Sequence, residues 1–596
     1  MKKYRKSLFP LVTVFITASL FSCKSQADSK VQSSSALSFS HDPGIYTLKF
    51  SLTVTPEDSN NTIFYTKDGS EASAASPQFS GTKYSVTSLK NQTSGYVLTP
   101  AVKAWQGYSG YSYIDRGHTL SFIEVNQEGQ TVAKKRGSFI INSRPKIPVI
   151  CLTAPPESWI GEDGDGGLYN TDPATGSDEK YRAWLEYFDY SKNEFFSLSS
   201  QMKRGGNWTR YYPVRTINLN FKKDQDGNKN KAPKVNIFNS RKGCGTKLPV
   251  EGQIKRLRLH VGGNDLYGAM FTDAFIQQLA YNAGLNVGTA AYRPCILYLN
   301  GEYWGFYMIR EHYNADYFEY NYGINDDNIL YVDRPWNGDT AETSYARYHF
   351  SVKDGDQNLN LAALEELYLA LGYDWASQTL YDQDSENYKD FTQDSVYEDF
   401  CKLVDIDSLI DLILVEGYAG NWDFMFNNLR MWRSAEIEEG NTYGDCRWRF
   451  VLHDLDVGFS SATADAKLAD SNWTSGKKSY FDYYLGNERL NHSLNGQTKW
   501  YLPLCEHIIL SQPAKNQKFK KRLLERAQYI EEAFSYDNAS VLLESFKKEA
   551  EPYMENRAER WGYNKSLWES GVSQKDSVLQ KRGDYFIKQV KAAFGI

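Results

Sequence analysis

The pattern of apolar and polar positions divides the chain into a strand-rich beginning and a helix-rich end. From about residue 40 to 143, alternating runs such as GIYTLKFSLTVT (44–55) are separated by turn residues, which is typical of antiparallel sheets. Farther on, FTDAFIQQLAYNAG (271–284) and LVDIDSLIDLILVEGYAG (403–420) repeat apolar residues at helical spacing and end in glycine. The pattern predicts an α+β chain that begins with a β-rich unit.

Two glycine-containing turns lie among predicted strands in the middle of the chain. In QMKRGGNWTRYYPVRTINLNF (201–221), Gly205 and Gly206 separate two strands. A tight turn explains this pair, although backbone amides at such a turn can also approach phosphate oxygens. In PCILYLNGEYWGFYMIRE (294–311), the Asn-Gly pair predicts a hairpin. The order strand, glycine turn, strand, helix, hairpin is that of a kinase N-lobe, but many α+β domains share it.

Two acidic segments farther along indicate a metal site. GNWDFMFNN (420–428) precedes one predicted strand, and HDLDVGF (453–459) ends the next. If these strands pair, Asn428 and Asp454 become neighbours. Asp423 precedes Asn428 by the interval found in the catalytic loop of protein kinases. Oxygen ligands of this kind suit Mg²⁺ or Mn²⁺, although turn capping is the simpler role for a loop Asp and Asn.

The first 39 residues read as an export segment followed by a tether. A basic start, MKKYRK, is followed by an apolar run that is too short to span a membrane and ends in LFSC (20–23). These residues resemble the lipobox of bacterial lipoproteins, so we expect a signal peptide over 1–22 and a lipid-modified Cys23, followed by a Ser-rich tether over 23–39. An ordinary signal peptide is the alternative. The pattern predicts an exported lipoprotein of the outer membrane or cell surface, held to the membrane by its N-terminal lipid.

Composition narrows the choice of partners. A net charge of −6 without a basic stripe argues against nucleic-acid binding. Aromatic residues make up 15% of the chain, which suits contact with sugars but is equally explained by β-rich extracellular domains. Apart from Cys23, six cysteines are scattered without zinc-ligand spacing, so we predict buried thiols and no disulfides. DGDGG (163–167) lacks the full ligand series of a calcium loop and is interpreted as a turn.

The β-rich unit resembles the small β-sandwich at the C-terminus of chitobiases and hexosaminidases. The resemblance rests on YTKDGS (65–70) with Ser76 and on VKA (102–104). It implies an accessory module over 40–143 that could contact cell-surface polysaccharide, while Asp68 is expected to be a turn residue. We expect this module to fold by itself and the rest of the chain to hold the whole site.

Residues 147 to 596 resemble the CotH family of spore coat protein H kinase-like proteins. The resemblance rests on RGGNWTR (204–210), LRLHVGGND (257–265), NGEYWGFYMIRE (300–311), GNWDFMFNN and HDLDVGF. It implies an atypical protein-kinase fold, with an N-lobe over about 147–315 and a helical C-lobe over about 316–596. It further implies that the chain uses ATP with Mg²⁺ or Mn²⁺ and phosphorylates exported or surface proteins.

The resemblance also implies a role for each matching residue. Asp423 would be the catalytic aspartate, Asn428 and Asp454 the metal ligands, and Asp456 a supporting carboxylate or a ligand of a second metal ion. The nucleotide would contact Arg204, Gly205, Gly206, Asn207, Arg215 and Glu311.

Two positions depart from the family pattern. Arg215 stands where the family commonly has the phosphate-contacting lysine, and the helix over 271–284 offers Gln277 and Gln278 where a carboxylate should face that cation. This leaves Asp273 or Asp265 to pair with Arg215. The departures keep open a pseudokinase or a carbohydrate-binding surface lipoprotein. A glycosidase using Asp454 and Asp456 is disfavoured, because residues two apart on a strand share a face.

Overall fold

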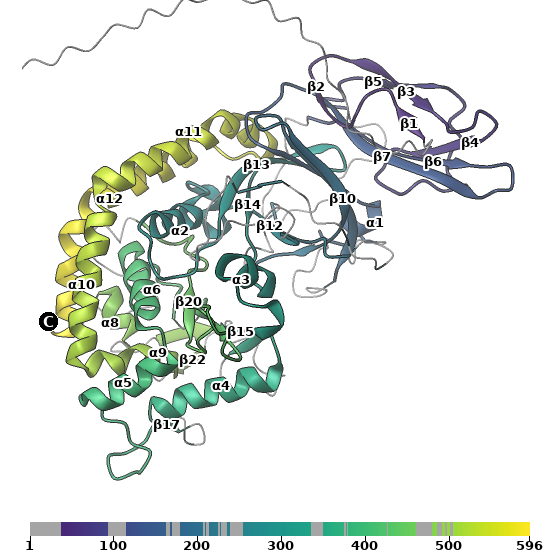
Figure 1. Cartoon of the computed structure of the whole chain (residues 1–596). Helices are drawn as coiled ribbons and strands as arrows, with labels where there is room; N and C mark the ends of the chain where they lie inside the picture. The colour runs from purple at the N-terminus through teal and green to yellow at the C-terminus, as the bar shows by residue number, and fades with distance from the viewer. Residues whose placement is uncertain are drawn as a thin grey trace, which may run out of the picture.

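The computed structural model describes most of the chain from residue 37 to 596 (Figure 1). The described residues are 37–92, 115–161, 167–169, 179–206, 209, 212, 214–223, 227, 230, 235–238, 254–334, 350–374, 377, 379–425, 427–460, 479–485, 491–494, 497–500 and 505–596. Residues 23–36 of the predicted tether with Cys23, Val102–Ala104, residues 163–166 and Asn207 lie outside them, whereas residues 38–39 at the end of that tether form a strand.

The N-terminal unit consists of two sheets, with strand orders β1-β3-β5 and β2-β7-β6-β4. In β3, Leu52 and Val54 face inward while their neighbours are more exposed, which is the alternation that the sequence predicts. These two side chains pack with Phe122 and Phe139 of the other sheet, so the unit is a sandwich. Its strands are β1 (Ser38–Phe39), β2 (Gly44–Tyr46), β3 (Phe50–Thr55), β4 (Thr62–Thr66), β5 (Lys83–Val86), β6 (His118–Val125) and β7 (Thr131–Ile141).

Seven strands next form a closed barrel in the order β10-β11-β12-β14-β13-β8-β9. The predicted hairpin over 294–311 is confirmed, since β13 and β14 pair across Asn300 and Gly301. The barrel contains β8 (Val149–Thr153), β9 (Tyr181–Asp189), β10 (Glu194–Arg204), β11 (Ile217–Asn220), β12 (Arg256–His260), β13 (Tyr292–Leu299) and β14 (Glu302–Arg310), with the short helix α1 (Pro156–Trp159) after β8. Helix α2 (Thr272–Asn282) lies between β12 and β13 in the chain.

The remaining residues form a mostly helical part around a sheet of order β16-β15-β19-β20. Its strands are β15 (Ile329–Asp333), β16 (Ser351–Asp354), β17 (Tyr373–Asp374), β18 (Thr379–Leu380), β19 (Arg430–Ser434), β20 (Arg449–Val451), β21 (Asn491–Leu494) and β22 (Gln497–Trp500). Its helices are α3 (Ala315–Tyr322), α4 (Gln357–Ala370), α5 (Asp394–Leu403), α6 (Ile406–Ala419), α8 (Tyr480–Tyr484), α9 (Cys505–Ser511), α10 (Gln517–Ala533), α11 (Tyr536–Trp561) and α12 (Lys565–Phe594). The predicted α+β class is confirmed.

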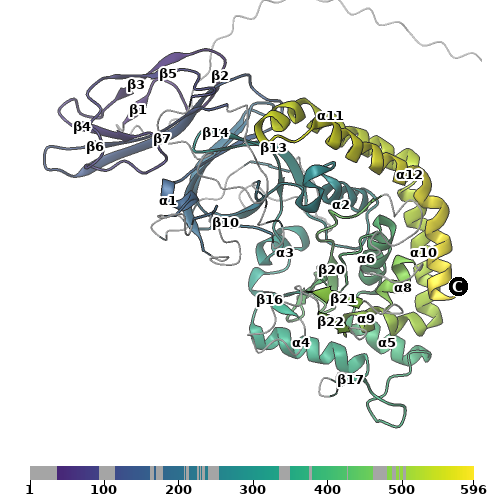
Figure 2. The same ribbon diagram turned by 180° about the vertical axis from the view of Figure 1, so that it is seen from behind.

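Helices α11 and α12 follow the outer edge of the molecule in both views (Figures 1 and 2). At the barrel, Trp561 Nε1 donates to the Trp304 carbonyl at 2.6 Å. In the helical part, the Arg582 guanidinium donates to the Gly417 and Tyr418 carbonyls at the end of α6. The two helices therefore contact both the barrel and the mostly helical part that follows it, which together form the second unit of the chain.

A turn of the sandwich interlocks with a turn of the barrel. The Asn300 Nδ2 group donates to the Asp68 carbonyl at 2.9 Å and to the Ala154 carbonyl at 2.8 Å. A Cβ atom on Gly69 would lie 2.3 Å from the Ala154 oxygen, so only glycine fits there. The Gly117 amide also donates to the Gly301 carbonyl at 2.8 Å. The two turns that carry the family resemblances thus contact each other.

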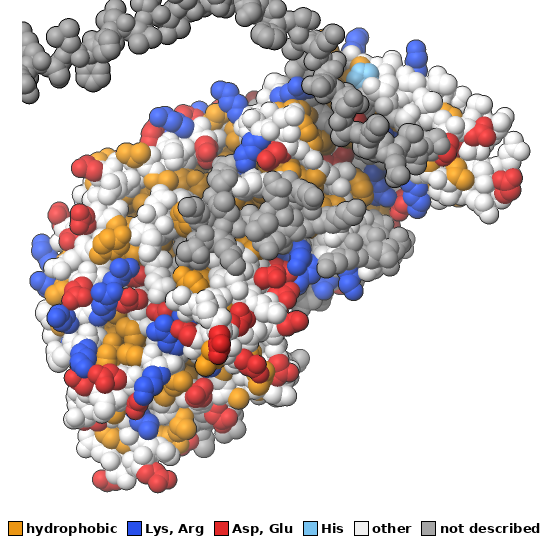
Figure 3. Space-filling view, viewed as in Figure 1, with side chains coloured by type: hydrophobic (Ala, Val, Ile, Leu, Met, Phe, Trp, Pro, Cys, Tyr) orange, Lys and Arg blue, Asp and Glu red, His pale blue; other side chains and the backbone are white. Residues whose placement is uncertain are grey.

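On the face shown in Figure 3, acidic and basic side chains are interspersed rather than gathered by sign. None of the described helices is both long and apolar enough to cross a membrane.

Candidate active site

Strands β19 and β20 bring the two acidic segments together. They pair antiparallel, with Arg430 opposite Val451, so the residues before β19 lie beside the residues after β20. The predicted pairing of these strands is confirmed. It places Asn428, two residues before β19, and Asp454, three residues after β20, at the same end of the hairpin.

Asn421 connects the end of α6, the loop of Asp423 and the segment of Asp454. Helix α6 ends at Gly420, whose φ of 65° turns the chain into the loop. The buried Asn421 side chain donates to Glu416 Oε2 at 2.9 Å and to the Asp454 carbonyl at 3.3 Å, and it accepts from the Asp423 amide at 3.1 Å. One amide side chain thereby fixes the relative positions of both acidic segments.

The Asp423 carboxylate is held by two amide side chains. Asn428 Nδ2 donates to Asp423 Oδ2 at 3.2 Å and to the Asp423 carbonyl at 2.9 Å. Asn427 Nδ2 lies 3.4 Å from both carboxylate oxygens. No cation pairs with Asp423 among the described residues, which leaves its oxygens available to a ligand.

Burial and mutual repulsion disfavour the charged forms of the carboxyl groups at this site. Burial, followed by the nearby Asp454, raises the pKa of Asp423 to about 7. Burial and the charge of Asp273 raise the pKa of Asp454 to about 6. Burial also raises the pKa of Glu416 well above its usual range.

This donor set fits a divalent cation. A cation bound at Asp454 would offset the negative charge that, after burial, raises the pKa of Asp423, and carboxylate and amide oxygens are the ligands that Mg²⁺ and Mn²⁺ prefer. In addition, Glu416 Oε1 is buried without a hydrogen-bond partner in the described part of the chain. Asn428 and Asp454 would hold the ion, as the sequence predicts. Glu416 is connected to Asp454 indirectly, because the Asn421 side chain donates to both.

The backbone at the site adopts left-handed conformations at residues other than glycine. Asn428 has φ of 63°, Asp454 of 61° and Met425 of 75°. Such conformations cost about 1–3 kcal/mol each and persist where the surrounding structure enforces them.

Asp456 binds a loop of the barrel. Its Oδ2 atom accepts from the Asn264 amide at 2.6 Å, and a Cβ atom on Gly263 would lie 1.9 Å from the same oxygen. Gly263 and Asn264 open the 3-10 turn η4 (Gly263–Tyr267) after β12. Asp456 therefore joins the helical part to the barrel beside Asp454, and its role toward a metal ion stays a prediction.

Arg215 lies elsewhere, and its expected pairing is wrong. Its guanidinium donates to the Leu168 carbonyl at 2.9 Å and stacks on the Tyr169 ring. Asp273 instead pairs with Arg310, and Asp265 accepts from the Thr272 hydroxyl and amide. The physical reason is that Arg215 precedes β11, whereas Arg310 ends β14 opposite α2.

The other predicted nucleotide contacts are placed as follows. The Gly205 amide donates to the Thr216 carbonyl at 2.8 Å, and Gly206 has φ of 81°, so both glycines form the turn between β10 and β11. Arg204 is buried at the end of β10. Glu311 accepts from the Ala291 amide at 2.5 Å and the Tyr320 hydroxyl at 2.8 Å, and it forms no ion pair within the described residues.

A polar cavity beside Asp454 was not predicted from the sequence. It lies between β12 and β14 of the barrel and the β19–β20 hairpin, and we call it the arginine cavity. It is lined by Arg258, His260, Asp273, Gln277, Ala290, Arg310, Glu311, His312, Tyr313, Arg430, His453 and Asp454. The alternation of Arg256, Arg258 and His260 along RLRLH was the available signal, because such residues share one face of a strand.

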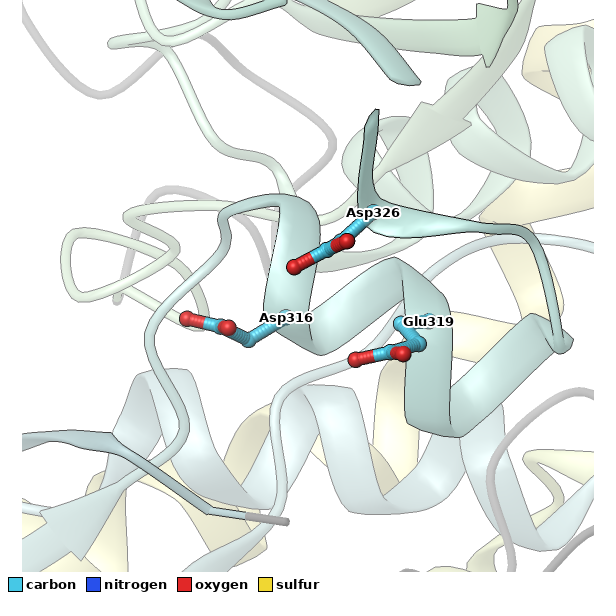
Figure 4. Close-up of side chains that lie close together, drawn as sticks. All are labelled: Asp316, Glu319 and Asp326. Carbon is cyan, nitrogen blue, oxygen red and sulfur yellow. The ribbon is translucent and has the colours of Figure 1, made fainter. Parts of the chain in front are cut away.

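A separate acidic cluster lies on α3 and the following turn. Asp316, Glu319 and Asp326 approach one another there (Figure 4). However, Asp316 Oδ1 already accepts from Lys222 at 2.8 Å and from Lys255 at 3.2 Å. These lysines neutralise the carboxylate that a metal ion would need.

Comparison with known protein families matches residues 203–586 to the family described as CotH kinase protein. The match covers more than half of the chain and includes the barrel strands from β11 onward, the β19–β20 hairpin and most of α12. Comparison with curated proteins finds no match.

Proposed function

Because the chain belongs to the CotH kinase family, we propose that it is a metal-dependent protein kinase that transfers the γ-phosphoryl group of ATP to hydroxyl groups of exported or surface proteins. The observation that carries this proposal is the convergence of Asp423, Asn428 and Asp454 at one end of the β19–β20 hairpin, tied together by Asn421.

In this proposal Asp423 accepts the proton of the attacking hydroxyl. Its pKa of about 7 suits a general base near neutral pH, and the amides of Asn427 and Asn428 orient its oxygens. The hydroxyl oxygen bonds to the γ-phosphorus as the bond to ADP breaks, and the proton moves to Asp423. Asn428 and Asp454 would hold a divalent ion, which when bound neutralises phosphate charge.

Export and membrane attachment are part of the proposal. They rest on the segment ending in LFSC and on the tether that follows it. We further propose that the sandwich contacts cell-surface polysaccharide, which rests on the resemblance carried by YTKDGS (65–70).

A nucleotide-binding protein without phosphotransfer is the second candidate. The observation that favours it is the position of Arg215, whose guanidinium contacts Leu168 and Tyr169 instead of the site carboxylates. Nothing at the expected lysine position therefore reaches the metal ligands in the described residues.

The test measures nucleotide binding and phosphoryl transfer by the purified mature chain with Mg²⁺ or Mn²⁺. We expect Asp423→Asn to lower turnover roughly 10²–10⁴-fold while nucleotide affinity is kept, because this residue acts on the hydroxyl. Asp454→Asn should abolish metal-dependent binding. Asp407→Asn, at a half-buried carboxylate on α6 that pairs with Arg522, serves as the control and should change neither. If the parent chain binds nucleotide but transfers no phosphate to any protein, the second candidate replaces the first.

A further inference from the structure

A crevice lies at the junction of the sandwich and the barrel, which are side by side in both views (Figures 1 and 2). Its lining includes Thr119, Arg136 and Gly137 of the sandwich and Trp184 and Glu186 of the barrel. It shares no lining residue with the arginine cavity. Because both units form its walls, any change in how they pack against each other changes the surroundings of these side chains.

Glu186 is a buried carboxyl group of this crevice, and only one of its oxygens is bonded. It lies on β9 and is 1% exposed. Its Oε1 atom accepts from the Ser138 amide of β7 at 3.1 Å, which is a hydrogen bond across the junction. Its Oε2 atom is buried and has no hydrogen-bond partner in the part of the chain that the structure describes. The Thr119 hydroxyl and Trp184 Nε1 are likewise buried and unpartnered within those residues. An ionised carboxylate here would therefore be held by a single amide.

The elements packed around Glu186 supply no counter-ion that pairs with it. Arg136 of β7 lines the crevice, but among the described residues its guanidinium pairs with Glu71, at 3.1 Å, and not with Glu186. The strand neighbours of Glu186 are Cys151 of β8 and Ser197 of β10. Burial, followed by the charge of Glu186, raises the pKa of the Cys151 thiol well above its usual range, so this thiol is neutral. The lining residues from β6 and from the turn after β4 carry no ionisable group.

These surroundings make the packing of the two units depend on protonation of Glu186. Burial raises the pKa of Glu186 to about 7, although the bond from Ser138 and the charge of Arg136 act in the opposite direction. If the sandwich moved away, water would replace its walls of the crevice, and the pKa would fall toward the ordinary value of about 4.3. The packed arrangement therefore binds the proton more tightly. As pH rises from about 4 to about 7, the packing loses free energy, and above that range the loss stays constant.

We propose that Glu186 is a proton-dependent latch that holds the sandwich against the barrel. With its proton, the neutral carboxyl group stays in the crevice and keeps the bond from the Ser138 amide. When the proton leaves to solvent, the carboxylate has one donor in place of a hydration shell, and the contact between the two units weakens. The latch sets how firmly the N-terminal module is held to the unit that carries the candidate active site. It does not depend on the proposed phosphotransfer.

The experiment measures hydrogen exchange of the Ser138 amide in the full mature chain at pH 4.5 and pH 8, corrected for the intrinsic exchange rate. We expect protection of this amide to fall roughly 10²-fold in the parent between the two pH values. Glu186→Gln keeps the shape of the neutral carboxyl group and cannot ionise, so its protection should change less than threefold. Glu128→Gln removes an exposed carboxylate between β6 and β7 and should show the same fall as the parent.

Amides of the β6–β7 ladder in the parent serve as the internal reference, because they should lose far less protection than the Ser138 amide. Unchanged protection at Ser138 in the parent overturns the latch, whether or not Glu186→Gln folds. A fall in Glu186→Gln equal to that of the parent also overturns it. An equal loss at the ladder amides would mean that the sandwich unfolds instead of separating from the barrel, which contradicts the proposal as well.

Discussion

At the residue scale, the site depends on polar side chains whose hydrogen bonds span several elements. Asp423, Asn428 and Asp454 could be selected from the sequence because their types and spacing match metal-dependent phosphotransfer. Asn421 and Glu416 could not, since nothing in GNWD or in an apolar helix shows which amide faces which carboxylate. Likewise, the partner of Asp273 depends on how β14 packs against α2, so the prediction that Asp273 or Asp265 pairs with Arg215 was wrong, while the contact of Arg215 with a nucleotide stays a prediction.

The raised pKa values predict a pH dependence of stability for the metal-free protein. The pKa of Asp423 is about 7 and that of Asp454 about 6 in the folded chain, above the usual value of about 3.9 for an unfolded aspartate. The folded state therefore binds these protons more tightly, and its free energy of unfolding falls as pH rises from about 4 to about 7. Above about pH 7 both groups are charged, and the loss of unfolding free energy caused by burying these charges no longer changes with pH.

We therefore expect Asp423→Asn to raise the Tm of the metal-free protein at pH 8 by a few degrees and to leave it nearly unchanged at pH 4.5. The measurement is thermal unfolding in chelator at both pH values. Adding Mg²⁺ at pH 8 should raise the Tm of the parent and not that of Asp454→Asn. The prediction is contradicted if Asp423→Asn and the parent show the same change of Tm between pH 5 and pH 8 in chelator. In that case the ionisation of Asp423 does not affect stability.

At the element scale, the turn η4 joins the barrel to the segment after β20. Gly263 has φ of 59°, and a Cβ atom there would lie 1.9 Å from Asp456 Oδ2. Gly284, which follows α2, has nearly the same φ of 63° but no atom within 4 Å of its Cβ position. The two glycines share a left-handed backbone conformation, which glycine adopts without strain, and differ in the contact with Asp456.

This pair predicts unequal effects of the same substitution. Gly284→Ala should cost about 1 kcal/mol of unfolding free energy, which is the usual penalty for a left-handed alanine. Gly263→Ala should cost roughly a further 1–3 kcal/mol for the clash, and it should also lower phosphoryl transfer, because Asp456 is two residues from Asp454. Chemical denaturation and activity assays test both. Equal losses for the two variants would mean that Asp456 moves aside without consequence.

Element types were more predictable than their assembly. Helices α2 and α6 and the β13–β14 hairpin follow from periodicity and an Asn-Gly turn, which are local signals. The closure of seven strands into a barrel depends on β8 pairing in parallel with β13 and on β12 pairing with β14. Pairings between distant segments leave little trace in a single sequence, so the barrel could not be predicted.

At the scale of the whole molecule, the sandwich and the barrel share polar contacts that the sequence does not reveal. The expectation that the sandwich folds by itself treats the linker after residue 143 as its only connection. The structure adds the Asn300 amide, which serves Asp68 and Ala154 at once, and the buried Glu186, whose Oε1 accepts from the Ser138 amide at 3.1 Å. Burial raises the pKa of Glu186 to about 7, so burying this carboxyl group costs the folded state most above that pH, where the group is charged.

We expect the sandwich and barrel to unfold in a single calorimetric transition at pH 6. Asn300→Ala removes the shared amide and should separate a lower transition belonging to the sandwich. Asn325→Ala, which removes an exposed turn-capping amide of the helical part, is the control and should leave one transition. Two well-separated transitions in the parent chain would show that the interlocking turns do not couple the two units.

Helices α11 and α12 also bear on how the site opens. The barrel and the helical part each bind this pair, through Trp561 at one end and Arg582 at the other. A hinge motion that widened the gap between the two parts would have to break one of these sets of contacts. Residues 536–594 therefore act as a clamp on the two parts that carry the site. We expect a chain shortened at its C-terminus to have a looser catalytic centre, although the removed residues contribute no side chain to it.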